Sequence, residues 1–208
     1  MTKAYIMTKP LASRIALVTG ASRGIGYATA RALARAGAHI VAIARTQGGL
    51  EELDDEIRKD GGSATLVPLN LTDFDGIARL GAALHERHGT LDILVGNAGI
   101  AGPSSPLGHI ELKPWNDVMA INVTANFQLI RCMDPLLRVS DAGRAVFVTS
   151  GVASKASAYQ GPYAASKAAL DTLARSWANE TASTKLRVNL FSPGPIRTRM
   201  RASVFPGE

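Results

Sequence analysis

Aromatic residues and cysteine are scarce in this sequence of 208 residues. Phe, Trp and Tyr make up only 5% of it while hydrophobic residues make up 46%, so Ala, Val, Ile and Leu must fill any core. The single cysteine, Cys132, cannot form an intrachain disulfide, which fits a reducing compartment. No apolar run approaches the roughly 18 residues that an ordinary membrane-spanning helix needs. The composition therefore predicts a compact, soluble, cytoplasmic protein with no membrane partner.

Acidic residues are fewer than basic ones, and the net charge of +6 raises the question of a nucleic-acid partner. The basic residues are spread along the whole chain, and the densest local group is Arg197, Arg199 and Arg201. No basic run is interleaved with aromatic residues, and no C-x-x-C pattern is present. We interpret the excess charge as a solvated basic surface that attracts anionic ligands, and we expect no nucleic-acid partner.

Apolar runs and helical patterns alternate regularly from Arg14 onward. Residues 1–13 contain no apolar segment long enough for a signal peptide, and we expect them to form a disordered leader outside the fold. Six apolar runs predict strands at Ile15–Thr19, His39–Ala44, Ala64–Leu69, Leu91–Val95, Arg144–Thr149 and Arg187–Phe191. Helical spacing is found at Tyr27–Ala36, Leu50–Lys59, Phe74–His88, Trp115–Val139 and Tyr163–Thr184. This alternation predicts an α/β fold, a doubly wound parallel sheet with helices on both faces, in a single domain at residues 14–208.

A glycine-rich turn follows the first predicted strand. It reads Thr19-Gly20-Ala21-Ser22-Arg23-Gly24-Ile25-Gly26, with glycine spacing G-x-x-x-G-x-G. Glycines let a backbone approach a ligand closely, and the start of a helix offers N–H groups to a phosphate. A glycine-rich turn alone is weak evidence, but this one lies between a strand and an Ala-rich helix. The position predicts a site for the phosphates of a dinucleotide.

The end of the second predicted strand carries arginine where an NAD enzyme carries an acid. The sequence there is Ala44-Arg45-Thr46-Gln47, with no Asp or Glu to bind a ribose 2′-hydroxyl. A guanidinium at Arg45 suits a 2′-phosphate because it is planar, always charged and can bind two oxygens, and Arg23 can add a second positive charge. The alternative is that Arg45 is a solvated loop residue. The pattern favours NADP over NAD.

A tyrosine and a lysine four residues apart open the helix after the fifth predicted strand. Tyr163 and Lys167 share a helix face, and a cation beside a phenol lowers the pKa of the phenol toward the range that a general acid–base needs. Tyr5 and Lys9 have the same spacing by chance. Ser150, at the end of the fifth strand, is either a plain loop hydroxyl or a donor to a substrate oxygen.

Together these motifs resemble the short-chain dehydrogenase/reductase (SDR) family, in the family's order and over nearly the whole chain from Arg14 to Arg199. Asn97-Ala98-Gly99 resembles the family's structural Asn-Ala-Gly motif, and Asn122 lies where the family keeps its catalytic asparagine. Pro193-Gly194-Pro195-Ile196-Arg197-Thr198 resembles the segment that cradles the nicotinamide. The sequence departs from the family at Gly96, where a second Asn is common, and at Asn70 before Leu71, where Asp usually flanks the adenine.

The resemblance implies a Rossmann-like fold and a set of site residues. The catalytic tetrad would be Asn122, Ser150, Tyr163 and Lys167. The cofactor would contact Gly20, Ser22, Arg23, Gly24, Ile25, Gly26, Arg45, Thr46, Asn70, Leu71, Asn97, Ala98, Gly99, Tyr163, Lys167, Pro193, Gly194, Ile196 and Thr198.

The resemblance also implies the reaction, reversible hydride transfer between NADP(H) and a carbonyl or secondary alcohol, with no metal. Tyr163 would exchange a proton with the substrate oxygen, Ser150 would orient that oxygen, Lys167 would lower the Tyr163 pKa and bind the ribose, and Asn122 would hold a relay water. The second hypothesis, a cofactor-binding regulator or scaffold with little catalysis, is disfavoured by the intact tetrad. The substrate stays open among 3-oxoacyl thioesters, steroids, sugars and small ketones.

Two further expectations come from the family's size and assembly. Its members commonly run about 40 residues longer, so we expect the family's last strand and helix to be missing here. Helices around Trp115–Val139 and Tyr163–Thr184 form the family's dimer contact, which predicts a homo-dimer or homo-tetramer. His85 and His88 lack a third metal ligand nearby, and Cys132 lies inside an apolar helix, so we interpret these three as solvated or packed residues.

Overall fold

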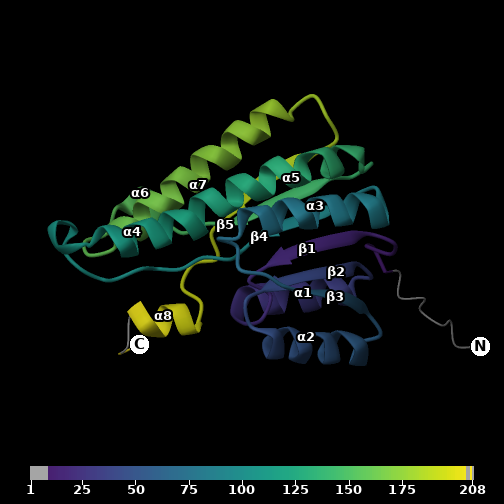
Figure 1. Ribbon diagram of the computed structural model, residues 1–208, viewed down its shortest axis with the longest axis horizontal. Helices are drawn as coiled ribbons and strands as arrows, with labels where there is room; N and C mark the ends of the chain where they lie inside the picture. Colours follow the sequence, from purple (N-terminus) through teal and green to yellow (C-terminus); the bar gives the residue numbers. More distant parts are fainter. Residues whose placement is uncertain (1–8, 205–206, 208) are drawn as a thin grey trace, which may run out of the picture.

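A computed structural model describes residues 9–204 and 207, and its centre is a six-stranded parallel sheet (Figure 1). The strand order is β3-β2-β1-β4-β5-β6, so the order reverses between β1 and β4. The strands are β1 Ile15–Thr19, β2 His39–Ala44, β3 Ser63–Pro68, β4 Ile93–Gly96, β5 Arg144–Val148 and β6 Arg187–Phe191. The doubly wound parallel sheet predicted from the sequence is confirmed.

Helices cover both faces of this sheet. The helical elements are α1 Gly24–Arg35, α2 Gln47–Lys59, α3 Phe74–His88, η1 Leu107–His109, α4 Leu112–Met119, the π-helical turn η2 Ala120–Thr124, α5 Ala125–Val139, α6 Val152–Lys155, α7 Gly161–Glu180 and α8 Arg199–Val204. Figure 1 shows α3, α5 and α7 on one face, and α1 with α2 on the other. No helix among the described residues is long and apolar enough to cross a membrane.

Two hydrophobic cores lie on the two faces, and aliphatic residues dominate both. The first joins β1, β4 and β5 to α3, α5 and α7, with Phe147 and Trp177 in edge-to-face contact at 6.1 Å between ring centroids. The second is built on Ala30 and Ala34 of α1 and on leucines and Ile57 of α2. All five residues of β1 are buried, as expected for a strand covered on both faces. The sheet thereby becomes a rigid platform for the loops at its carboxyl edge.

Several element boundaries differ from the sequence predictions by one to four residues. The fourth strand begins at Ile93 rather than Leu91. Just before it, the carboxylate of Asp92 accepts a hydrogen bond from Ile15 N at 2.9 Å and so fixes the start of the strand against β1. The predicted helix Trp115–Val139 begins earlier, at Leu112, and contains the π-helical turn η2. The short helices α6 and α8 were not predicted.

Residues 9–13 contact the domain, although we expected residues 1–13 to lie outside it. Leu11 N donates to Ala36 O at 2.9 Å, and the Leu11 side chain packs against the α1–α2 core. Residues 1–8, which include Tyr5 of the accidental Tyr–Lys match, lie outside the described residues. The boundary at residue 14 stays a prediction.

Candidate active site

The glycine-rich turn joins β1 to α1 and has the conformation that its glycines allow. Gly20 and Gly24 have φ angles of +66° and +59°, in the left-handed region that favours glycine. A Cβ on Gly26 would lie 2.4 Å from both Asn97 Nδ2 and Gly20 O, so only glycine fits there. Arg23 at the N-cap of α1 is extended, and no side chain caps the helix. The turn can therefore offer backbone N–H groups to a phosphate.

The hydroxyl of Thr19 joins the glycine-rich turn to the loop after β4. Thr19 Oγ1 accepts hydrogen bonds from Asn97 N and Ala98 N, both at 3.0 Å, and donates to Val95 O at 3.3 Å. A further hydrogen bond joins the same two residues, because Asn97 Nδ2 donates to Thr19 O at 2.8 Å. These bonds fix Asn97, Ala98 and Gly99 beside the turn at the point where the strand order reverses, the usual ligand crevice of such sheets.

Asn122 lies in the π-helical turn and is fully buried. Its Nδ2 donates to Ile100 O and to Ser166 Oγ, each at 2.9 Å, and its Oδ1 accepts from Ile100 N at 2.9 Å. The backbone oxygen of Asn122 accepts from Asn126 Nδ2 at 2.9 Å. Asn122 thus anchors the loop after β4 to α7, and it does not line the cavity described below. Insertion of a π turn at a functional position is a common device in helices.

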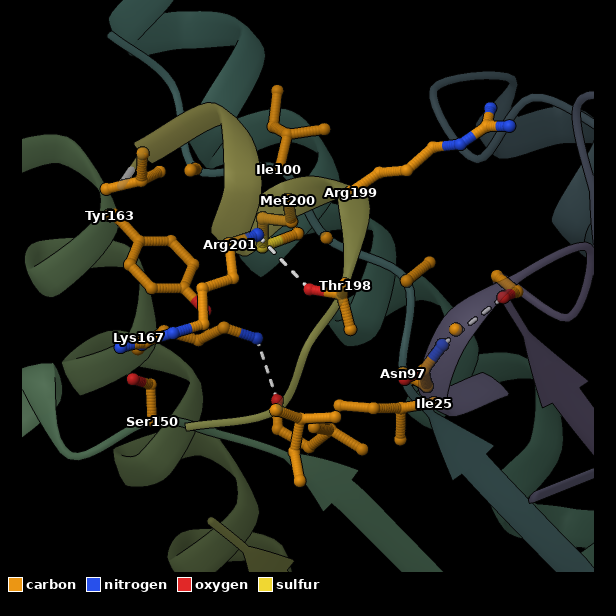
Figure 2. A pocket seen from close by; sticks show the side chains of 18 of the residues that line it. Ile25, Asn97, Ile100, Ser150, Tyr163, Lys167, Thr198, Arg199, Met200 and Arg201 are labelled. Carbon is orange, nitrogen blue, oxygen red and sulfur yellow. Dashed lines mark hydrogen bonds between the residues drawn. The ribbon is translucent and has the colours of Figure 1, made fainter. Parts of the chain in front are cut away.

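Ser150, Tyr163 and Lys167 meet at one end of the cavity, where β5 ends and α7 begins (Figure 2). Lys167 is 3% exposed, and its Nζ donates to Val148 O at 2.7 Å. The same Nζ lies 5.8 Å from the centroid of the Tyr163 ring. Burial lowers the pKa of Lys167 to about 8, and the nearby charge of Asp171 opposes that shift.

The pKa of Tyr163 is raised, whereas we expected Lys167 to lower it. Burial of the phenol is the larger cause, and a hydrogen bond with the Ser150 side chain lowers the pKa only in part. The Lys167 ammonium donates one hydrogen bond to Val148 O. Because its pKa is about 8, the side chain is only partly protonated near that pH. Burial therefore outweighs the hydrogen bond with Ser150, and the net shift of the Tyr163 pKa is upward.

A single cavity of about 1190 Å³ connects this catalytic end to the glycine-rich turn. It is lined by all the predicted cofactor residues except Gly26, namely Gly20, Ser22, Arg23, Gly24, Ile25, Arg45, Thr46, Asn70, Leu71, Asn97, Ala98, Gly99, Tyr163, Lys167, Pro193, Gly194, Ile196 and Thr198. None of the described residues that line it is Asp or Glu. Arg45 is exposed at the end of β2, so both the phosphate-binding and the solvated interpretation remain compatible with its position.

The segment after β6 closes the cavity opposite the sheet edge. A Cβ on Gly24 would lie 3.5 Å from Thr198 Cγ2, which places Thr198 directly over the glycine-rich turn. Thr198 Oγ1 accepts a hydrogen bond from Arg201 N at 3.1 Å and so begins α8. The cavity wall therefore continues from Pro193 through α8, whose residues Arg199–Val204 we had not assigned to the site.

Sequence reasoning also missed Asp171 and Ser166. Thr149 Oγ1 donates to Asp171 Oδ1, while Ser166 Oγ donates to Tyr163 O at 2.8 Å and accepts from Asn122. Both residues lie on α7, eight and three positions after Tyr163, so only the helix register could have suggested them. Cys132 is half-buried, and burial raises the pKa of its thiol. The described residues hold no cluster of three or more side chains that could bind a metal, and this applies to His85 and His88 as well.

Residues 14–208 match the family model for short chain dehydrogenase. This chain belongs to the short-chain dehydrogenase family. An uncharacterized oxidoreductase, YciK, from Escherichia coli is 37% identical over 95% of this chain and 79% of its own length. The cis-4-hydroxycyclohexanecarboxylate dehydrogenase of Sinomonas cyclohexanicum is 36% identical with the same coverage. A short chain dehydrogenase of Shigella flexneri, solved in complex with NADP, superimposes with a TM-score of 0.92 at 38% identity, over 97% of this chain and 85% of its own.

Family membership confirms the resemblance found in the sequence, and with it a dehydrogenase/reductase that uses a nicotinamide cofactor. The roles assigned to individual residues follow from their geometry and stay predictions. The structure brings Ser150, Tyr163 and Lys167 into one cavity and keeps Asn122 behind its wall.

Proposed function

We propose that this short-chain dehydrogenase interconverts a carbonyl compound and a secondary alcohol with NADP(H), and that Tyr163 is its general acid–base. The observation that carries the proposal is the convergence of Ser150, Tyr163 and Lys167 at one end of a cavity whose other end is the glycine-rich turn. Hydrolase chemistry is disfavoured because none of the described residues that line the cavity with Ser150 is His or Asp, the pair that would activate a serine nucleophile.

The cavity fits the cofactor by its shape and its charge. Gly26 leaves the backbone of the turn open where any Cβ would collide with Asn97, and the uncapped start of α1 suits the pyrophosphate. Arg45 and Arg23 line the same end without an acidic neighbour in the lining, which favours a 2′-phosphate over a free 2′-hydroxyl. The Shigella relative solved with NADP supports this choice. We therefore assign Arg23 and Arg45 to the 2′-phosphate.

The protein's own groups supply the proton chemistry. When bound, the nicotinamide supplies or accepts the hydride at its C4 atom. In the reductive direction the Tyr163 hydroxyl donates its proton to the carbonyl oxygen, and the Ser150 hydroxyl donates a hydrogen bond to the same oxygen. Lys167, held by Val148 O, stabilises the resulting tyrosinate and binds the nicotinamide ribose. In the oxidative direction Tyr163 takes the proton from the alcohol.

We further propose a cytoplasmic homo-dimer or homo-tetramer that acts on a small-molecule carbonyl or alcohol substrate. Leu112 and Phe127, on α4 and α5, are 72% and 46% exposed and supply apolar surface for a contact between copies of α5 and α7. The Sinomonas relative, named for a cyclic hydroxycarboxylate, supports a secondary-alcohol substrate.

The test compares Tyr163→Phe with a matched Tyr27→Phe control, which lies on α1 outside the cavity. NADPH and NADH binding and NADPH oxidation with a panel of carbonyl compounds are measured for each protein. We expect Tyr163→Phe to lower kcat by roughly 10²–10⁴-fold, the range for loss of a general acid, while NADPH still binds. Tyr27→Phe should retain turnover. Tight NADPH binding without turnover of any carbonyl, in wild type and Tyr163→Phe alike, would refute the enzyme and favour the regulator.

A further inference from the structure

Three side chains on one face of α7 contact the chain where β5 ends. They are Tyr163, Lys167 and Asp171, at positions i, i+4 and i+8 of the helix. Residues at this spacing lie on the same stripe of a helix. Asp171, one turn beyond Lys167, is half-buried and does not line the cavity. It can therefore act on the reaction only through its neighbours.

The three contacts fall on three consecutive residues of the chain. In chain order the pairs are Val148 with Lys167, Thr149 with Asp171, and Ser150 with Tyr163. In the first pair, the lysine Nζ donates to the backbone oxygen of Val148 at 2.7 Å. In the second, the threonine hydroxyl donates to the carboxylate oxygen Oδ1. The Asp171 contact thus lies between the two contacts that the proposed reaction already uses.

The contact with Asp171 fixes Thr149 on a second side. Thr149 is 8% exposed, and its backbone N–H donates to Phe191 O of β6 at 2.9 Å. Its hydroxyl joins the same residue to α7, and a hydrogen bond to a charged acceptor is about twice as strong as a neutral one. Because Ser150 follows directly, its hydroxyl keeps its place beside Tyr163. A displacement of about 1 Å at a reacting group can lower a rate by about 10²-fold.

Asp171 also supports the charge of Lys167. Burial lowers the pKa of Lys167 to about 8, and the negative charge of Asp171 opposes that shift. The other titratable or charged groups on this side are Tyr163 on α7, Lys155 on α6 and Arg201, which extends toward Lys167 from α8 (Figure 2). The segments directly after β4 and β5 contribute only uncharged residues to the cavity. Asp171 is therefore the carboxylate that favours the protonated lysine.

We propose that Asp171 is a positioning residue of the reaction. Its hydrogen bond with Thr149 fixes the backbone that leads into Ser150. Its negative charge favours the protonated form of Lys167, which stabilises the tyrosinate formed at Tyr163. This role rests on the proposed function, since it requires that the last three of these residues serve the reacting groups.

Two substitutions of nearly unchanged volume separate the hydrogen bond from the charge. Asp171→Asn keeps an oxygen that accepts a hydrogen bond but removes the charge, whereas Thr149→Val removes the hydroxyl and keeps the charge. Thr149→Ser retains the hydroxyl as the conservative variant. For each full-length protein, kcat of carbonyl reduction by NADPH is measured against pH. The titration of Lys167 is followed separately by NMR at its Cε carbon, with Lys167→Met to assign the resonance.

The two substitutions should have different signatures. In Asp171→Asn, the midpoint of the Lys167 titration and the basic limb of the kcat profile should both move down by about one pH unit, because an opposite charge is lost. In Thr149→Val, kcat should fall by roughly five- to tenfold at every pH through displacement of Ser150, with the midpoint unchanged. Thr149→Ser should restore most of that loss.

The control is Glu180→Gln on the same helix, an exposed carboxylate that accepts a hydrogen bond from Ser176 Oγ at 3.2 Å. It should keep the wild-type kcat, pH profile and Lys167 midpoint. A loss of kcat in Asp171→Asn with the midpoint unmoved would show a structural role only and overturn the proposal.

The outcomes also separate this proposal from the proposed function. If the wild type reduces a carbonyl compound, and neither Asp171→Asn nor Thr149→Val changes kcat or the midpoint, the positioning role is overturned and the proposed function stands. If the midpoint falls in Asp171→Asn but the wild type reduces no carbonyl compound, the effect of Asp171 on Lys167 is supported and the reaction is overturned.

Discussion

Lys167 carries its charge in an environment that opposes it. The side chain is buried, and its Nζ is held by one backbone oxygen, that of Val148, and lies near the ring of Tyr163. The carboxylate of Asp171 favours the protonated lysine, and this carboxylate also accepts a hydrogen bond from Thr149. The result is a lysine that titrates near pH 8, close enough to neutrality for its charge to respond to a bound ligand.

This lowered pKa predicts how stability changes with pH. The unfolded chain keeps Lys167 protonated up to its ordinary pKa of about 10.4, so above pH 8 the unfolded state binds more protons than the folded state and the free energy of unfolding rises. Relative to Lys167→Met, the wild type should gain about 2 kcal/mol between about pH 7 and about pH 9.5. Urea unfolding at both pH values measures the gain.

The control for this measurement is Lys113→Met, whose ammonium is exposed and paired with Asp117 at 2.8 Å. That pairing raises the pKa of Lys113, so its contribution is constant over the same pH range and should not rise. A wild-type gain that equals the gain in Lys167→Met would show that Lys167 does not titrate as described.

Arg45 gives a second prediction at the scale of single residues. Replacement by Asp puts a carboxylate where the 2′-phosphate would bind, so affinity for NADPH should fall by at least tenfold, as expected when a charged hydrogen bond of about 1.5–3 kcal/mol is lost. Affinity for NADH should change less, since Asp can accept a bond from the ribose 2′-hydroxyl. Fluorescence titration with both nucleotides measures the two changes. Equal losses for both nucleotides would refute the 2′-phosphate role of Arg45.

At the scale of elements, the glycine-rich turn and the π-helical turn have different structural roles. The glycine-rich turn keeps backbone exposed to a ligand, whereas the π-helical turn uses backbone and side chain of Asn122 to join α5, α7 and the loop after β4. The first creates space at the carboxyl edge of the sheet, and the second fixes the wall of that space. Both depend on neighbours distant in sequence, Asn97 for the first and Ile100 for the second.

The space required at the glycine-rich turn can be tested by adding one methyl group. Gly26→Ala would bring a Cβ within 2.4 Å of Asn97 Nδ2 and Gly20 O, so the turn must move. We expect NADPH affinity to fall at least tenfold and stability to fall by about 1–3 kcal/mol, the usual cost of overpacking. Thermal unfolding and NADPH titration measure the two effects.

Gly48 offers a matched control for that substitution. It also lies in a helix, α2, but a Cβ there would meet nothing within 4 Å. Gly48→Ala should therefore raise stability by roughly 0.5–1 kcal/mol through helix propensity and leave NADPH affinity unchanged. An equal loss in both variants would contradict the steric explanation.

At the scale of the whole molecule, most of the fold could be predicted because its strands are short apolar runs separated by regular helices. Ile15–Thr19 and Arg187–Phe191 were predicted to the residue. The helices α6 and α8 could not be predicted, since four and six residues are too few for a periodic pattern. The π-helical turn lies within the predicted helix Trp115–Val139, and the amino-acid composition of that segment does not distinguish a π turn from an α-helical one.

The site could be predicted less completely than the fold. Residues at strand ends, such as Ser150 and Arg45, follow from the rule that ligands bind at the carboxyl edge. The facing of Arg201 into the cavity depends on how the chain turns after Thr198, and no spacing in the sequence shows it. The raised pKa of Tyr163 depends on burial of the phenol, which outweighs the hydrogen bond with Ser150, and the sequence shows neither the burial nor the contact.

The strand order also constrains when the cavity can form during folding. The glycine-rich turn follows β1, while Pro193–Thr198 follows β6 at the far edge of the sheet, so the cavity needs both the first strand and the last. Parallel strands pair only after long crossovers, which makes such sheets slow to assemble. Whatever the order of pairing, the cavity wall at Pro193–Thr198, where we expect the nicotinamide to bind, cannot form before β6 joins β5. Affinity for the nicotinamide portion of the cofactor would therefore report, during refolding, the moment at which the sheet is finished.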